Sequence, residues 1–147
     1  MVSRAWQVLD DELARWRDAG RSVDFWWRDD DATQWTPALE RLVDLAGEMD
    51  VPIALAVVPA TADPALFDRL GERHADACVL QHGVDHQNRG GDGGKRTEFA
   101  ATEPDADALA RIAAGRARLA ALAGARALGV FAPPWNRLPA TLAARLP

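Results

Sequence analysis

The stretch PIALAVV, residues 52–58, decides the fold class of this chain. It is a short, uninterrupted apolar run that opens on a proline, which is typical of a strand buried on both faces of a parallel sheet. An amphipathic helical pattern precedes the run, and a second one begins after it at Asp63-Pro64 and continues to about His74. The run therefore predicts one strand between two helices, the repeating unit of a parallel α/β protein.

The same alternation of strand and helix continues on both sides of this run. Further strands are expected at Val23–Arg28, Ala77–Gln81 and Ala127–Ala132. Further helical patterns begin at Thr36-Pro37, cover Glu103–Ala125 and start again near Leu138. Each expected strand is followed by a helix, which is the order that crossover connections require in a parallel sheet.

An extra helix is expected before the first strand, ending near Gly20. Its apolar side chains recur at three- and four-residue steps, the spacing of one helix face. These side chains are Trp6, Leu9, Leu13 and Trp16. We expect both of these tryptophans, together with Trp26 and Trp27, to lie in the core, whereas Trp35 fits either the core or the surface.

Four β-α units amount to half of a closed (β/α) barrel, which needs about 200 residues or more. The 147 residues therefore fit either a small open sheet or the N-terminal part of a longer barrel, and the second interpretation is favoured. We expect residues 1–147 to form a single, truncated domain. An open half-barrel has two edge strands without partners, so the chain is predicted to form homo-oligomers through these edges.

Composition and charge exclude several classes of function. The net charge is −5, with acids and bases interspersed, so no nucleic-acid partner is expected. No apolar stretch reaches membrane-spanning length, and the charged, amphipathic N-terminus does not resemble a signal peptide, so no membrane partner is expected. The single cysteine, Cys78, cannot form an internal disulfide, which fits a reducing cytoplasm.

Charged and metal-ligating side chains gather where the first and third expected strands end. Residues 26–32 read WWRDDDA, and three consecutive carboxylates after an apolar run call for a positive charge nearby. His82 and His86 are four residues apart, so their imidazoles can converge on one ion. Asp30 or Asp31 can complete the ligand set from the first strand. The pattern favours a divalent metal, with Zn²⁺ as the first choice and Co²⁺, Ni²⁺ or Fe²⁺ as alternatives.

The competing interpretation of these residues is structural, with aspartates that cap a helix and histidines on a polar loop. One aspartate suffices for a cap, so three in succession are harder to explain in this way. Alternation along a strand sends neighbouring carboxylates in different directions. We therefore expect one carboxylate to bind metal, its neighbour to act as a base and the third to pair with Arg28.

The fourth strand ends in APPWN, residues 132–136, which fits either a rigid turn or one wall of the same site. The indole of Trp135 suits a sugar ring or an acyl group. The backbone N–H groups near Trp135 and Asn136 suit an oxyanion. Pro134, Trp135 and Asn136 are therefore the candidate substrate-binding residues.

Together, these three strand ends resemble motifs of the polysaccharide deacetylase superfamily, the NodB-homology carbohydrate esterases. Residues 30–32, Asp-Asp-Ala, are similar to the family's Asp-Asp-Gly. Residues 82–86, His-Gly-Val-Asp-His, are similar to its histidine-pair motif, and residues 132–136 to its third motif. The resemblance covers essentially the whole chain, and RDDDA with QHG-x-x-H-x-N and PPWNR is most similar to a divergent bacterial deacetylase-like branch.

The resemblance implies a role for each of these residues. Asp30 would be the general base, and the metal ligands would be Asp31, His82 and His86. In an alternative register Asp29 is the base and Asp30 is the ligand. The first register is preferred because Ala32 then falls on the family's glycine.

Three positions depart from the family pattern. Gly83 stands where the family has Ser or Thr, and Ala132 stands where it has an arginine. No histidine follows His86, so the family's late catalytic histidine has no counterpart in this chain.

The implied activity is metal-dependent removal of an acetyl group from an N-acetylated carbohydrate or a related amide. The substrate would be a small molecule or a carbohydrate, and the chain offers no evident general acid for the leaving nitrogen. A second hypothesis is a non-catalytic metal- or carbohydrate-binding remnant of the same fold. A third, an iron(II) oxygenase, uses two histidines and one carboxylate as well, but the β-α pattern argues against it.

Overall fold

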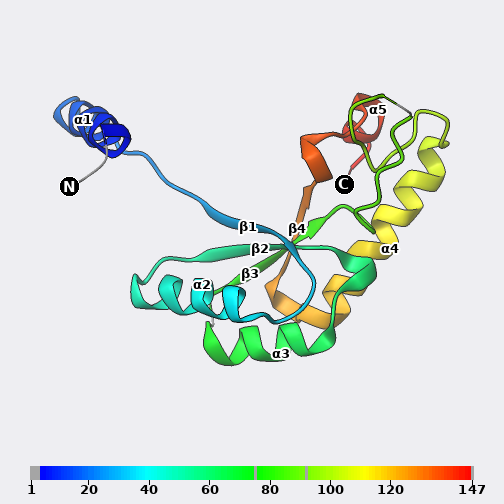
Figure 1. Ribbon diagram of the computed structural model, residues 1–147, viewed down its shortest axis with the longest axis horizontal. Helices are drawn as coiled ribbons and strands as arrows, with labels where there is room; N and C mark the ends of the chain where they lie inside the picture. The colour runs from blue at the N-terminus through cyan, green and yellow to red at the C-terminus, as the bar shows by residue number, and fades with distance from the viewer. Residues whose placement is uncertain (1–3, 75, 92, 147) are drawn as a thin grey trace.

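The structure is a computed structural model that describes residues 4–74, 76–91 and 93–146 (Figure 1). One parallel sheet holds four strands in the order β1-β2-β3-β4. The strands are β1 (Trp27–Ala32), β2 (Ile53–Val57), β3 (Cys78–His82) and β4 (Ala127–Ala132). Because the sheet order follows the chain order, right-handed crossovers place the connecting helices on one face of the sheet. This confirms the expected α/β fold, which is consistent with part of a (β/α) barrel.

Within the part of the chain that the structure describes, five α-helices and three short 3₁₀ turns connect or flank the strands. The α-helices are α1 (Arg4–Asp18), α2 (Pro37–Glu48), α3 (Pro64–Arg73), α4 (Asp105–Ala123) and α5 (Ala140–Ala143). The 3₁₀ turns are η1 (Pro59–Thr61), η2 (Gly124–Arg126) and η3 (Pro134–Asn136). Helices α2 and α3 lie side by side on one side of the sheet (Figure 1), and Arg73 of α3 forms an ion pair with Glu40 of α2. Among the described residues, no helix is both long and apolar enough to cross a membrane.

The main core lies between the sheet and helices α2, α3 and α4. Alternate side chains of β2 face it, and all three are almost completely buried: Ile53, Leu55 and Val57. The opposite face of β2 carries Ala54 and Ala56, which are also buried and belong to a second apolar cluster. Burial on both faces explains why the run from Ile53 to Val57 is continuously apolar.

Helix α2 begins at the cap that the sequence predicts. Thr36 has an extended backbone, Pro37 takes the first helical position, and the Thr36 Oγ1 accepts a hydrogen bond of 3.1 Å from the N–H of Leu39. We expect Thr36→Ala to lower the free energy of unfolding by about 1 kcal/mol, since that N–H loses its acceptor. Urea denaturation measures the change, and Thr36→Ser, which keeps the hydroxyl, is the control. Equal midpoints for wild type and Thr36→Ala would contradict this role.

The first strand begins later than expected, at Trp27 instead of Val23. The register explains the difference, because Trp27 pairs with Ile53, the first residue of β2, and the residues before it have no partner strand. They form an extended link to α1, which lies apart from the sheet (Figure 1). None of the residues of α1, from Arg4 to Asp18, is buried.

The expectation that four tryptophans lie in the core is wrong for three of them. Trp6 and Trp26 are 62% and 63% exposed. Trp16 makes local contacts instead, because its Nε1 donates to Glu12 at 2.9 Å and the Arg21 guanidinium stacks 4.2 Å from its ring centroid. Trp27 does pack against the main core, as does Trp35. The helical spacing of α1 correctly predicts an apolar face, but no described part of the chain covers that face.

Candidate metal centre

Asp31 reaches the site through an irregularity of the edge strand β1. Asp29 pairs with Leu55 and Ala32 pairs with Val57, so β1 has one residue more than β2 over this step, which is a β-bulge. Asp31 lies in the bulge with a φ of 68°, a left-handed conformation that aspartate adopts more readily than most residues. The bulge therefore breaks the strict alternation that the sequence suggests for these carboxylates.

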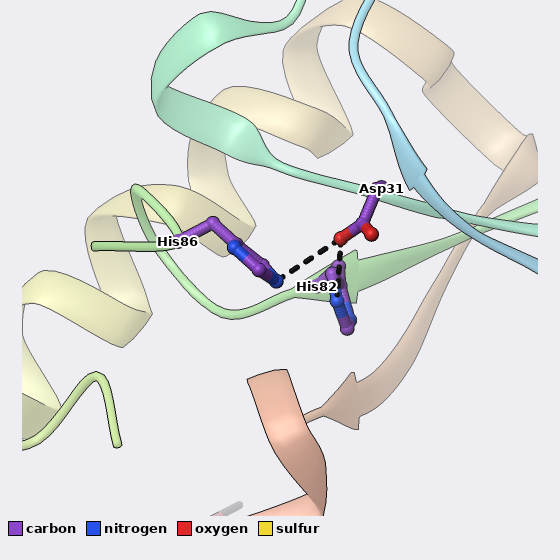
Figure 2. A group of neighbouring side chains, drawn as sticks. All are labelled: Asp31, His82 and His86. Carbon is purple, nitrogen blue, oxygen red and sulfur yellow. Dashed lines mark ion pairs between the residues drawn. The ribbon is translucent and has the colours of Figure 1, made fainter. Parts of the chain in front are cut away.

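Three side chains from two strands and a loop converge on one point (Figure 2). Asp31 comes from β1, His82 is the last residue of β3, and His86 follows on the next loop. The Asp31 Oδ1 lies 3.1 Å from the His82 Nε2 and 3.0 Å from the His86 Nε2. All three potential ligand atoms lie within 4.8 Å of one another. The structure thus brings together the three residues that the sequence analysis assigns as metal ligands.

The geometry of this triad fits a divalent transition metal. Ligands at about 2.1 Å from a tetrahedral zinc ion lie about 3.4 Å apart, close to the oxygen–nitrogen separations of 3.1 and 3.0 Å in the structure. Burial lowers the pKa of His82, which favours the neutral imidazole that binds metals, although the charges of Asp30 and Asp31 oppose this shift. The Asp31 side chain is 66% exposed, so one side of the site is open to solvent.

Asp30 lies beside the triad and is held by Arg28. The Arg28 Nε lies 2.7 Å from the Asp30 Oδ1, and the Nη2 donates to Oδ2 at 3.0 Å, which makes a bidentate ion pair. Arg28 is expected from the sequence to pair with a carboxylate other than the base, whereas the structure pairs it with Asp30, the candidate base itself. Burial, together with the charges of Asp30 and Asp31, raises the pKa of Asp29, the candidate base of the alternative register.

The 3₁₀ turn η3 places the three candidate substrate-binding residues next to the histidine pair. The Trp135 ring centroid lies 4.6 Å from that of His86, with the planes tilted by 53°, and Pro134 is buried beneath. The Asn136 N–H donates to the Pro133 carbonyl at 3.1 Å, so it is not free to bind an oxyanion. This leaves the Trp135 N–H as the candidate for that role.

Strained backbone gathers at this site. Five described non-glycine residues have a positive φ, and four of them belong to the triad or to η3: Asp31, His86, Trp135 and Asn136. Such conformations cost about 1–3 kcal/mol each and persist only where the surrounding structure holds them. Their concentration at one point is a feature of functional sites rather than of ordinary loops.

Two buried polar side chains behind the site were not predicted from the sequence. Gln81 donates from Nε2 to the Gly83 carbonyl at 2.9 Å and to the Ile112 carbonyl at 3.0 Å. Glu98, which is 0% exposed, accepts hydrogen bonds from the loop that carries His86. Gln81 stands next to His82 in the QHG stretch, but that spacing does not indicate its role, and Glu98 lies outside the motifs. Both side chains contact backbone groups and not another side chain of the motif.

Comparison with protein-family models and with curated proteins finds no match. Among solved structures, the chain is similar to one described as "T48 deacetylase with substrate", with a TM-score of 0.59 and 16% sequence identity. The match covers 82% of this chain and 57% of that deacetylase. At this identity the likeness shows the fold alone, so the chain has the fold of part of a deacetylase. The expected deacetylase-like fold is thereby supported.

Proposed function

We propose that this chain is a metal-dependent hydrolase that removes an acetyl group from an N-acetylated carbohydrate or a related amide, in the manner of the NodB-homology deacetylases. The observation that carries the proposal is the convergence of Asp31, His82 and His86 at one point of a fold shared with a deacetylase. Zn²⁺ is the cation proposed first, with Co²⁺, Ni²⁺ and Fe²⁺ as alternatives, since the donor set suits all four.

The residues around the triad have distinct tasks in this proposal. A bound cation supplies Lewis-acid chemistry, polarising a carbonyl and, for zinc, lowering the pKa of water toward about 7. Asp30, held in place by Arg28, takes a proton from the attacking water, and Asp29 is the alternative base. The Trp135 N–H faces the developing oxyanion while its ring contacts the sugar or the acetyl group. The water oxygen bonds to the carbonyl carbon, the leaving nitrogen takes up a proton from solvent as the C–N bond breaks, and acetate and an amine are released.

The lack of an evident proton donor for the leaving nitrogen, among the described residues, favours a second candidate function. The chain has three histidines; two belong to the triad, and the third, His74, lies at the end of α3. Among the described residues, none beside the triad is evident as a general acid. The second candidate is therefore a non-catalytic protein of this fold that binds a metal or a carbohydrate. In the catalytic proposal, the general acid is supplied from outside these 147 residues.

Acetate release from N-acetylated mono- and oligosaccharides tests the proposal. We expect wild type to release acetate, to stop after chelation and to recover with Zn²⁺. His86→Ala should be at least about 100-fold slower, because removing a ligand should cost no less than removing an outer hydrogen bond to one. His74→Gln, a histidine substitution outside the site, should match wild type. Metal binding without acetate release would support the second candidate, and full activity in His86→Ala would refute the metal assignment.

Location, domain extent and assembly are part of the same proposal. We propose a cytoplasmic protein, since Cys78 is a free thiol and the only cysteine of the chain. We also propose that the 147 residues act as one domain whose ligand is a small molecule or a carbohydrate, without nucleic-acid or membrane partners. Self-association through the sheet edges is supported by exposed apolar residues on β4, with Leu128 at 45% and Val130 at 42% exposure.

A further inference from the structure

We infer that Glu98 is a positioning residue for the metal centre, because its buried carboxylate holds the loop that carries His86 through three consecutive backbone N–H groups. The inference rests on the proposed function, since it concerns the geometry of the proposed metal ligands. It adds a residue that belongs to none of the three sequence motifs and that lies twelve positions after His86.

The contacts of Glu98 are almost entirely with backbone donors. Its Oε1 accepts hydrogen bonds from the N–H groups of Val84 at 2.9 Å, Asp85 at 2.6 Å and His86 at 2.8 Å. Its Oε2 accepts from the Val84 N–H at 3.0 Å. These N–H groups are the hydrogen-bond donors that the structure gives to the completely buried carboxyl group of Glu98.

Contacts on both sides of Glu98 fix its position next to the loop that carries His86. The Arg89 N–H donates to the Thr97 carbonyl at 2.7 Å, and Asn88 Oδ1 accepts from the Thr97 N–H at 3.1 Å. These bonds bring Thr97 next to Asn88 and Arg89, so Glu98 follows at the point where the chain returns to the loop that carries His86. On the other side, Phe99 is buried with its ring centroid 6.2 Å from that of Phe131. The position of Glu98 is therefore fixed from both sides.

The loop needs such support because its backbone is strained. His86 has a φ of 55°, and Gly83 at the start of the same turn has a φ of 62°. Without Glu98, three consecutive N–H groups would lose their acceptor, which is costly for buried donors. The turn would then relax, and the His86 imidazole would move away from the Asp31 oxygen that it now approaches to 3.0 Å. Glu98 contacts none of the triad side chains, so it acts through the loop.

Metal titration separates positioning from a merely structural role. Glu98→Gln keeps the size of the side chain but replaces an acceptor oxygen with an amide donor facing the loop N–H groups. We expect its affinity for Zn²⁺ to fall about 10–100-fold, the usual cost of losing an outer-shell partner, and the visible spectrum of the Co²⁺-loaded protein to change. Glu103→Gln is the matched control, since Glu103 is also largely buried but pairs with Arg111, and it should match wild type in both measurements.

Glu98→Asp keeps the charge on a shorter side chain and should fall between wild type and Glu98→Gln, which keeps the test open if Glu98→Gln fails to fold. Unchanged affinity and an unchanged Co²⁺ spectrum in folded Glu98→Gln or Glu98→Asp would overturn the inference.

Amide hydrogen exchange in the metal-free protein tests the loop independently of metal binding. We expect the Val84, Asp85 and His86 amides to exchange at least about 10-fold faster in Glu98→Gln than in wild type or Glu103→Gln. The amide donor would face the Val84 N–H whose hydrogen bond Oε2 now accepts, and the remaining uncharged oxygen would be a weaker acceptor for all three N–H groups, so local opening becomes easier. If the three amides exchange more slowly in wild type than in Glu98→Gln but wild type binds no metal, the proposed function would be refuted. The same result would still support the hydrogen bonds between Glu98 and the loop. Equal exchange in all three proteins would refute that hold.

Discussion

His82→Ala should leave this protein without its metal, whereas the wild-type chain should carry a near-stoichiometric transition-metal ion. His82 is the most buried member of the triad, because only 5% of its side chain is exposed to solvent. Removing it leaves one imidazole and one largely exposed carboxylate, too few ligands for a tight transition-metal site. We expect the affinity to fall by more than about 100-fold, the upper end of the cost of losing an outer-shell partner.

Elemental mass spectrometry measures the content directly on protein purified without chelator or histidine tag. His74→Ala is the control, because His74 ends α3 and belongs to no metal-ligand group among the described residues. Equal metal in wild type and His82→Ala, or none in either, would mean that the three aspartates of WWRDDDA have a structural role. Metal in wild type and in His74→Ala, but not in His82→Ala, would explain why the three carboxylates lie together, because a bound cation would offset their charge.

Gly83→Ala should be the most destabilising small substitution near the site. A Cβ at this position would lie 2.2 Å from the Glu98 Oε2 and 2.6 Å from the Pro134 Cγ, and the φ of 62° disfavours any side chain. Left-handed backbone costs about 1–2 kcal/mol and overpacking about 1–3 kcal/mol, so we expect a loss of about 3 kcal/mol. For a chain of this size the melting temperature should fall by about 10 °C.

Gly20→Ala separates the steric clash of an added Cβ from the cost of a side chain on a left-handed backbone. Gly20 has a similar φ of 67°, but no atom lies within 4 Å of a Cβ built there. Differential scanning calorimetry of both variants should therefore show a small change for Gly20→Ala and a large one for Gly83→Ala. If the two variants melt at the same temperature, the contact between position 83 and Glu98 does not matter. The same contact leaves no room for a Ser or Thr side chain at this position.

The sheet was predictable because its signal is local. The run from Ile53 to Val57 is buried on both faces, so it is apolar at every position. Ala127–Ala132 is recognisable as a short apolar run as well, although Leu128 and Val130 within it are exposed. The grouping of Asp31, His82 and His86 was predictable for another reason. The carboxyl ends of parallel strands meet at one edge of the sheet, and the residue types there are metal ligands.

The remaining features depend on contacts that no spacing encodes. The start of β1 is set by where β2 begins, and the bulge at Asp31 by the pairing register of these two strands. The apolar face of α1 could be predicted, but not whether another surface covers it. Glu98 binds backbone N–H groups, which every residue except proline carries, so no sequence pattern marks its target.

The position of Asp31 on an edge strand also has a thermodynamic consequence. Strand β1 is held to the sheet through β2 alone, whereas the histidines lie on β3 and the loop after it. A cation bound by all three side chains would act as a cross-link that spans β2 and ties the outermost strand to the interior of the sheet. Folding and occupancy would then be linked, and a free-metal concentration 100 times the dissociation constant would add about 2.7 kcal/mol to the unfolding free energy. The melting temperature would thus measure site occupancy without any knowledge of the substrate.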